Sequence, residues 1–197
     1  SSDLTMTTHK VLRGPRGGMI LCRSQYASMI DQAVFPGLQG GPHNHTVAGI
    51  ATALYEASTP AYRQYGKKVL ENASFLAQFL IDEGFELVTG GTDTHLILID
   101  LRKKKLPGKV LSRALANAGI ITNANMVPGD KGSPKHPNGL RLGTPAVTTR
   151  GMGEEEMKFI ARKIARVAAH PEDTGRLQIV KKEVLEMTAR FSTFPEF

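Results

Sequence analysis

One lysine lies among hydroxyls, an imidazole and glycines in the stretch Thr7-Thr8-His9-Lys10-Val11-Leu12-Arg13-Gly14-Pro15-Arg16-Gly17-Gly18. The apolar and β-branched residues at 4–8 and 18–22 predict a strand on each side of it. A lysine is nucleophilic only after its ammonium loses a proton, and burial beside cations such as Arg13 and Arg16 lowers its pKa. We therefore interpret Lys10 as a buried, reactive amine at the mouth of a strand-turn-strand unit, although most lysines are solvated.

The composition is that of a globular protein with a sizeable core, since 197 residues carry 41% hydrophobic side chains. A net charge of +7 invites a nucleic-acid interpretation, but the basic residues are dispersed, Trp is absent, and no nucleic-acid motif appears. Apolar runs are shorter than the ~20 residues of a membrane span. We therefore expect neither nucleic acid nor membrane as a partner. The single Cys22 suits a reducing compartment.

Helical periodicity and turn residues divide the chain into elements. The expected helices are 24–34, 43–57, 60–83, 108–118, 154–169 and 176–190. The expected strands after the third helix are 85–88, 95–101, 120–122 and 140–142. Alternating strands and helices indicate an α/β or α+β unit that begins around Gly84, and the Pro- and Gly-rich residues 128–139 predict a binding loop.

Four segments resemble, in order, the signatures of one enzyme family. They are the lysine stretch, Phe35-Pro36-Gly37-Leu38-Gln39-Gly40-Gly41-Pro42-His43-Asn44-His45, Gly90-Gly91-Thr92-Asp93-Thr94-His95 and Gly139-Leu140-Arg141-Leu142-Gly143-Thr144-Pro145-Ala146. The family is serine hydroxymethyltransferase, a fold-type I enzyme that depends on pyridoxal 5′-phosphate. Its cofactor lysine lies near mid-chain, so the resemblance is to the C-terminal half of the enzyme. It implies an α/β fold in which residues 1–83 end the cofactor-binding large domain and residues 84–197 form the C-terminal small domain.

The resemblance also implies roles for individual residues. Lys10 would form the imine with pyridoxal phosphate, while His9 and Thr7 would line the pocket and Thr7 would assist imine exchange. Thr8 is equally well explained as a strand residue that faces away. Arg141 would bind the substrate carboxylate with two parallel hydrogen bonds, because a planar guanidinium matches a carboxylate.

Further implied roles fall on loops. The amides of Gly40 and Gly41, next to a helix start, would approach the cofactor phosphate of a neighbouring subunit, which implies a homodimer or tetramer. Asn125 and Ser133 would contact tetrahydrofolate, with Asn123 as a weaker candidate. No metal is expected, because His43 and His45 are two residues apart on a helix and so should not face one another.

The implied reaction interconverts serine plus tetrahydrofolate with glycine plus 5,10-methylenetetrahydrofolate. We expect this chain to be inactive alone, because the family's remaining cofactor and acid-base residues belong to the N-terminal half. A fold-type I aldolase without folate, such as threonine aldolase, is one alternative. A non-catalytic half-enzyme with a regulatory or RNA-binding role is another. The expected location is the cytoplasm, with the mitochondrion left open.

Overall fold

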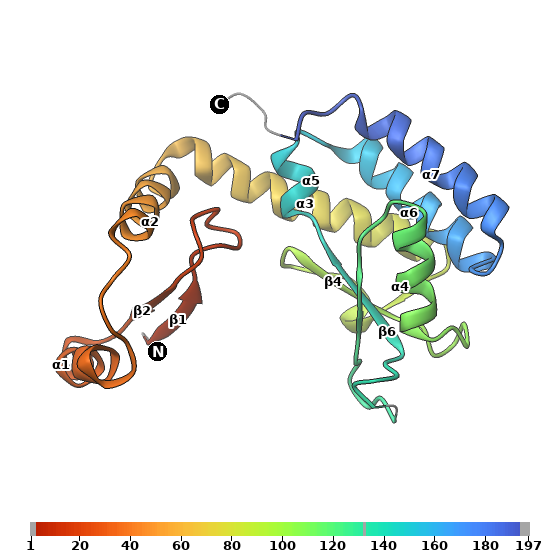
Figure 1. Cartoon of the computed structure of the whole chain (residues 1–197). Helices are drawn as coiled ribbons and strands as arrows, with labels where there is room; N and C mark the ends of the chain where they lie inside the picture. Colours follow the sequence, from red (N-terminus) through yellow and green to blue (C-terminus); the bar gives the residue numbers. More distant parts are fainter. Residues whose placement is uncertain (1–2, 132, 194–197) are drawn as a thin grey trace. The chain divides into compact units, whose positions relative to one another are not determined.

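A computed structural model describes residues 3–131 and 133–193 of the chain. Their contacts divide the chain into two compact units, the first ending at Gln64 and the second beginning at Tyr65. Figure 1 shows the first unit in red to pale orange and the second from yellow to blue.

The first unit begins with the expected strand-turn-strand arrangement. Strand β1 (Leu4–Thr7) pairs antiparallel with β2 (Gly18–Leu21), so that Thr7 lies opposite Gly18. The strands predicted at 4–8 and 18–22 are confirmed to within one residue. The lysine stretch is the loop that joins them.

Helical segments complete the first unit. Helix α1 (Ser24–Gln32) continues into the π-helical segment η1 (Ala33–Leu38), α2 (Asn44–Ala57) follows an exposed loop, and α3 (Pro60–Asp82) begins here. Pro60 suits the first helical position, because proline has a fixed φ and lacks only an N–H that would have no helical partner there.

Large apolar side chains of the first unit are unusually exposed. Leu38 is 88% exposed, Tyr55 75%, Met29 65% and Phe35 61%. The buried residues of this unit, among those described, are Thr8 and Ala53. The most exposed large apolar side chains of this unit thus come from α1, η1 and α2.

The second unit is built on a four-stranded antiparallel sheet in the order β3-β4-β6-β5. Its strands are β3 (Glu86–Leu87), β4 (Leu96–Asp100), β5 (Asn123–Asn125) and β6 (Gly139–Gly143). Ile97, Ile99 and Leu140 are fully buried, whereas Leu96 and Arg141 on the alternate positions are exposed. One face of the sheet therefore packs on the core, and the other carries Arg141.

Helices cover the buried face of this sheet. They are the later turns of α3, α4 (Gly108–Asn117), α6 (Glu154–Ala169) and α7 (Thr174–Thr188), and Figure 1 shows α3, α6 and α7 on the same side of β4 and β6. A short helix, α5 (Pro145–Thr149), follows β6 directly. The core joins sheet and helices through side chains such as Leu76, Leu115 and Ile164.

One expected strand is wrong. Residues 120–122 are not a strand, and β5 begins at Asn123 instead. The reason is local: Ile121 is 82% exposed, and the carbonyl of Thr122 accepts a hydrogen bond from Ser112 Oγ at 3.0 Å rather than from a strand. The other strands and the six helices appear near their predicted positions, and α5 is additional. The antiparallel sheet makes this unit α+β in arrangement.

Helix α3 crosses the division between the compact units. Tyr62 lies in the first unit, whereas Val69, Asn72 and Leu76 are buried in the second. By its contacts, the first unit ends at Gln64, nineteen residues before the predicted boundary at Glu83, and nineteen residues are roughly five turns of helix. These contacts involve this chain alone, so the division of the larger enzyme into residues 1–83 and 84–197 stays a prediction.

Candidate cofactor and substrate site

Hydrogen bonds at its stem fix the shape of the lysine loop. Thr8 N donates to Gly17 O at 3.1 Å, and Gly14 N donates to Thr8 O at 2.8 Å. Thr8 is only 1% exposed, and its Oγ1 donates to Pro15 O at 2.8 Å. Thr8 follows the last residue of β1, so it is a loop residue and not the strand residue of the alternative interpretation. Its hydroxyl ties the two arms of the loop together.

The tip of the loop is a turn from Lys10 to Arg13. Arg13 N donates to Lys10 O at 2.8 Å, and Arg13 has a φ of 59° in the left-handed region. The hydroxyl of Tyr62 donates to Val11 O at 2.7 Å, and the Arg13 guanidinium lies 5.7 Å from the centre of the Tyr62 ring. The backbone beside Lys10 is therefore tied to the start of α3.

Small residues allow the loop to pack closely on α2. A Cβ at Gly49 would lie 2.9 Å from Pro15 Cγ, and a Cβ at Gly14 would lie 3.1 Å from Ala53 Cβ. Larger side chains at these positions would push the loop away from the helix. The glycines of the lysine stretch thus serve close packing as well as turning.

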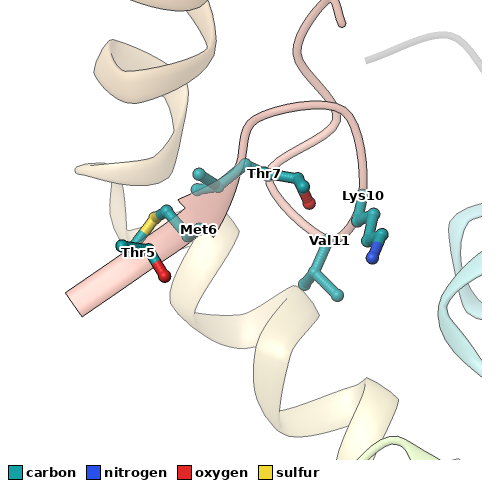
Figure 2. Close-up of a pocket in the computed structure, with 6 residues that line it drawn as sticks. Thr5, Met6, Thr7, Lys10 and Val11 are labelled. Atoms are coloured by element: carbon teal, nitrogen blue, oxygen red, sulfur yellow. The ribbon is translucent and has the colours of Figure 1, made fainter. Parts of the chain in front are cut away.

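Lys10 lies at the rim of an open cavity of about 580 Å³. Figure 2 shows Lys10 and Val11 reaching it from the loop and Thr5, Met6 and Thr7 from β1; Leu12 also lines it. The expected burial of Lys10 is wrong, because its side chain is exposed. The loop buries its stem, through Thr8, and leaves its tip open.

Thr7 and His9 were both expected to line the pocket, but the residues that line this cavity include Thr7 and not His9. Thr7 ends β1, is half-buried and lines the cavity. His9 Nδ1 is buried and has no hydrogen-bond partner among the described residues, while its Nε2 lies 3.5 Å from Arg16 Nη1. A buried ring nitrogen without a partner is unfavourable. A polar group from outside this chain would relieve it, so the residues around Lys10 fit a bound cofactor.

Gly40 and Gly41 lie in the exposed loop before α2. A Cβ at either position would meet nothing within 4 Å, so their amides are approachable. Within the part of the chain that the structure describes, no backbone–backbone hydrogen bond joins this loop to the lysine loop. The first unit thus leaves both glycines open to a ligand or another chain.

Arg141 lies on the open face of the sheet in the second unit. It pairs with Leu98 of β4 and Asn123 of β5, and Asn125 pairs with Gly139. Directly opposed residues share a face, as do residues two apart in a strand. The sheet therefore brings Arg141, Asn123 and Asn125 to the same face.

Ser133 is exposed and lies in the loop between β5 and β6. Val127 to Asp130 form a turn in which Asp130 N donates to Val127 O at 3.0 Å, with Gly129 at a φ of 70°. The Pro128-Gly129 pair is typical of a type II turn. His136 N donates to Ser133 O at 2.8 Å. The predicted binding loop is therefore an ordered loop over these residues.

Sequence reasoning missed the buried polar residues that join the segment after Arg141 to α3. Thr144 is fully buried and donates to Val69 O at 2.8 Å, and Asn72, also fully buried, donates to Thr148 Oγ1 at 2.8 Å and to Met152 O at 2.9 Å. These bonds join the end of β6 and α5 to α3. Only the placement of Asn72 on the apolar stripe of α3 signalled such a role.

His43 and His45, for which no metal was expected, lie just before and at the start of α2. The rings of His43 and His45 lie 5.7 Å apart edge to face, contrary to expectation, because His43 precedes the first residue of α2 and is not helical. Residues 3–131 and 133–193 contain no group of three metal-ligating side chains. In the same residues no helix has the length and apolar character to cross a membrane.

Comparison with known proteins decides the family. Residues 2–164 match the family model described as serine hydroxymethyltransferase. The chain belongs to the serine hydroxymethyltransferase family. This membership confirms the predicted fold class, fold-type I, and the α/β character of the chain agrees with it.

Three curated serine hydroxymethyltransferases are close relatives. That of Desulfotalea psychrophila is 51% identical over 95% of this chain and 44% of its own length. That of Sorangium cellulosum is 50% identical over 95% of this chain and 44% of its own length. That of Acidothermus cellulolyticus is 53% identical over 96% of this chain and 46% of its own length. The chain thus spans less than half the length of these relatives and matches their C-terminal portion.

Proposed function

We propose that the protein to which this chain belongs is a glycine hydroxymethyltransferase that uses pyridoxal phosphate and tetrahydrofolate. The observation that carries the proposal is the lysine loop: a hydroxyl-tied stem holds an exposed amine at the rim of a cavity, in a chain of this family. A non-enzymatic descendant would have no physical reason to keep this arrangement together with an open-face Arg141.

Each residue has a distinct task in this proposal. When bound, the cofactor supplies an electron sink for cleavage of a bond at the substrate's Cα. Lys10 Nζ would hold the cofactor covalently and move a proton as the substrate amine exchanges with it. The Thr7 hydroxyl, on the cavity wall, would assist that exchange, and His9, whose Nδ1 is buried without a partner among the described residues, would contact the cofactor. Arg141 binds the substrate carboxylate, which orients the bond to be broken.

Asn125 and Ser133 are proposed to bind the folate, with Asn123 as a further contact. Support comes from the sheet, which puts Asn123 and Asn125 on the same face as Arg141. A serine-derived one-carbon unit would then pass between sites on neighbouring elements. An aldolase without folate dependence would not need these amides.

Partners and location are also proposals. The apolar exposure of Met29, Phe35, Leu38 and Tyr55 supports a homodimer or tetramer in which Gly40 and Gly41 reach a partner's cofactor phosphate. The N-terminal half of the enzyme is a further partner of the same surface. The single cysteine supports a cytoplasmic location.

The first test is spectroscopic and needs no turnover. The purified chain is mixed with pyridoxal phosphate, alone and together with the N-terminal half of a relative, and the visible absorption band of the imine is recorded. We expect a band that survives in Lys103→Ala and is lost in Lys10→Ala, and borohydride trapping should place the adduct on Lys10. No band even with the complementing half would refute the proposal.

The second test separates the reaction classes. The complemented protein is assayed for serine cleavage with and without tetrahydrofolate. Folate-dependent cleavage supports the hydroxymethyltransferase, whereas cleavage of 3-hydroxy amino acids that ignores folate assigns an aldolase. Salt-sensitive RNA binding without any cofactor adduct would assign the non-catalytic role.

A further inference from the structure

Arg102 lies just after β4, and its guanidinium contacts both the carboxylate of Asp100 and the carbonyl of Gly129. Its Nε lies 3.0 Å from both carboxylate oxygens of Asp100, and its Nη2 donates to Asp100 Oδ2 at 2.6 Å. Its backbone N also donates to Asp100 Oδ1 at 3.0 Å. The carboxylate thereby fixes the orientation of the planar guanidinium.

The remaining arm of the guanidinium reaches the loop that carries Ser133. Arg102 Nη1 donates to Gly129 O at 3.2 Å. Gly129 is the left-handed residue of the turn that opens this loop. The side chain of Asp100 is only 11% exposed, whereas that of Arg102 is 45% exposed. The carboxylate that holds Arg102 is therefore largely buried.

Asp130 closes the same loop a few residues later. Its Oδ2 accepts from Asn138 N at 2.9 Å, and its Oδ1 accepts from Asn138 Nδ2 at 2.7 Å. Asn138 O in turn accepts from Leu101 N at 2.9 Å, next to Arg102. Both ends of the loop are thus tied to the end of β4.

Charge makes Arg102 central to this arrangement. The side-chain hydrogen bonds from Arg102 hold the pKa of Asp100 below its ordinary value, although the nearby charge of Asp130 acts in the opposite direction. Asp100 and Asp130 both raise the pKa of Arg102, after the direct hydrogen bond to Asp100. A cation between two carboxylates offsets their repulsion.

We propose that Arg102 is a positioning residue that holds the 127–138 loop, and with it Ser133, in the geometry that receives the folate. It acts through the Gly129 carbonyl and not by contact with the ligand. The inference rests on the proposed folate role of Ser133. The neighbouring Lys103, Lys104 and Lys105 are not part of it, since Lys103 pairs with Glu86 and Lys104 lies over the Phe85 ring.

The test compares three variants of neighbouring residues. Arg102→Gln removes the fork, Arg102→Lys keeps the charge but cannot reach both Asp100 and Gly129 in the same geometry, and Lys103→Gln is the matched control for charge. Amide hydrogen exchange of residues 127–138 is measured on the chain itself. We expect exchange about tenfold faster in both Arg102 variants, and wild-type exchange in the control.

Function is then measured on the complemented enzyme. The KM for tetrahydrofolate should rise about tenfold in both Arg102 variants, while the KM for serine and the cofactor band stay near wild type. A merely structural role would affect both substrates.

The outcomes separate this inference from the function it rests on. Unchanged loop exchange overturns the positioning role even if folate-dependent turnover is normal. Faster exchange with an unchanged folate KM also overturns it. A wild-type complemented enzyme that cleaves serine without folate refutes both the folate site and this inference.

Discussion

The close approach of α4 to β6 yields a sharp stability prediction. Gly108 opens α4, and its N donates to Pro137 O at 2.9 Å. A Cβ at this position would lie 2.3 Å from Gly139 O and 2.9 Å from Pro137 O. The distance to Gly139 O is about 1 Å shorter than an ordinary contact between a carbon and a carbonyl oxygen. The backbone of β6 or α4 therefore has to move.

The cost of Gly108→Ala follows from that displacement. Overpacking costs about 1–3 kcal/mol, and a weakened hydrogen bond to Pro137 adds about 1 kcal/mol. We therefore expect the free energy of unfolding of the second unit to fall by about 3 kcal/mol. With a urea m-value of about 2 kcal/mol/M, the midpoint should fall by about 1.5 M.

The matched control is the same substitution at Gly66 in α3. A Cβ there meets nothing within 4 Å, so Gly66→Ala should stabilise the helix by about 0.5–1 kcal/mol. Urea unfolding is followed by circular dichroism, and hydrogen exchange of the Ile97 and Ile99 amides assigns the transition to the second unit. If Gly108→Ala lies within about 0.5 kcal/mol of wild type, the contact geometry of α4 and β6 is wrong.

Three further predictions concern single side chains. Thr8→Val should cost about 1 kcal/mol by leaving Pro15 O without its donor, and faster exchange of loop amides than in wild type is the measurement; unchanged exchange would contradict it. Arg141→Lys should leave the urea midpoint unchanged, because the side chain is exposed. It should weaken glycine binding by the complemented enzyme about tenfold or more, since lysine cannot make two parallel hydrogen bonds to the carboxylate. An unchanged Kd for glycine would show that Arg141 does not bind the carboxylate. Glu183 joins α7 to α6 by accepting hydrogen bonds from Lys163 and Arg166, and these contacts lower the pKa of Glu183 from 4.5. Glu183→Gln should therefore lower the free energy of unfolding by about 1 kcal/mol at pH 7. That difference should be present above pH 4.5 and vanish as the pH falls through the lower folded pKa; a difference that persists in acid would contradict the assignment.

The sequence predicted most elements because their signals are local. Alternating residues beside glycines marked β1 and β2, and Pro60 marked the start of α3. Helix α5 and strand β5 escaped because tertiary bonds decide them: Thr144 and Thr148 bind α3 and one another, and β5 exists only by pairing with β6. Such contacts join residues far apart in the chain and leave no periodicity to read.

The exposure of the Lys10 side chain is a property of the site that the sequence did not predict. The motif around the lysine led us to expect a buried amine beside Arg13 and Arg16, at the mouth of the strand-turn-strand unit. Thr8, and not Lys10, is the residue that the loop buries, since its side chain bonds within the loop while the lysine points out of it. The hydrogen bonds within the loop hold its shape, while the amine of Lys10 stays exposed to solvent. The exposed apolar side chains of the same unit, Leu38 and Phe35 among them, support the proposed partner subunit or N-terminal half. If that partner covers Lys10, the cofactor band should gain intensity when the complementing half or a second subunit binds, and an unchanged band would contradict this.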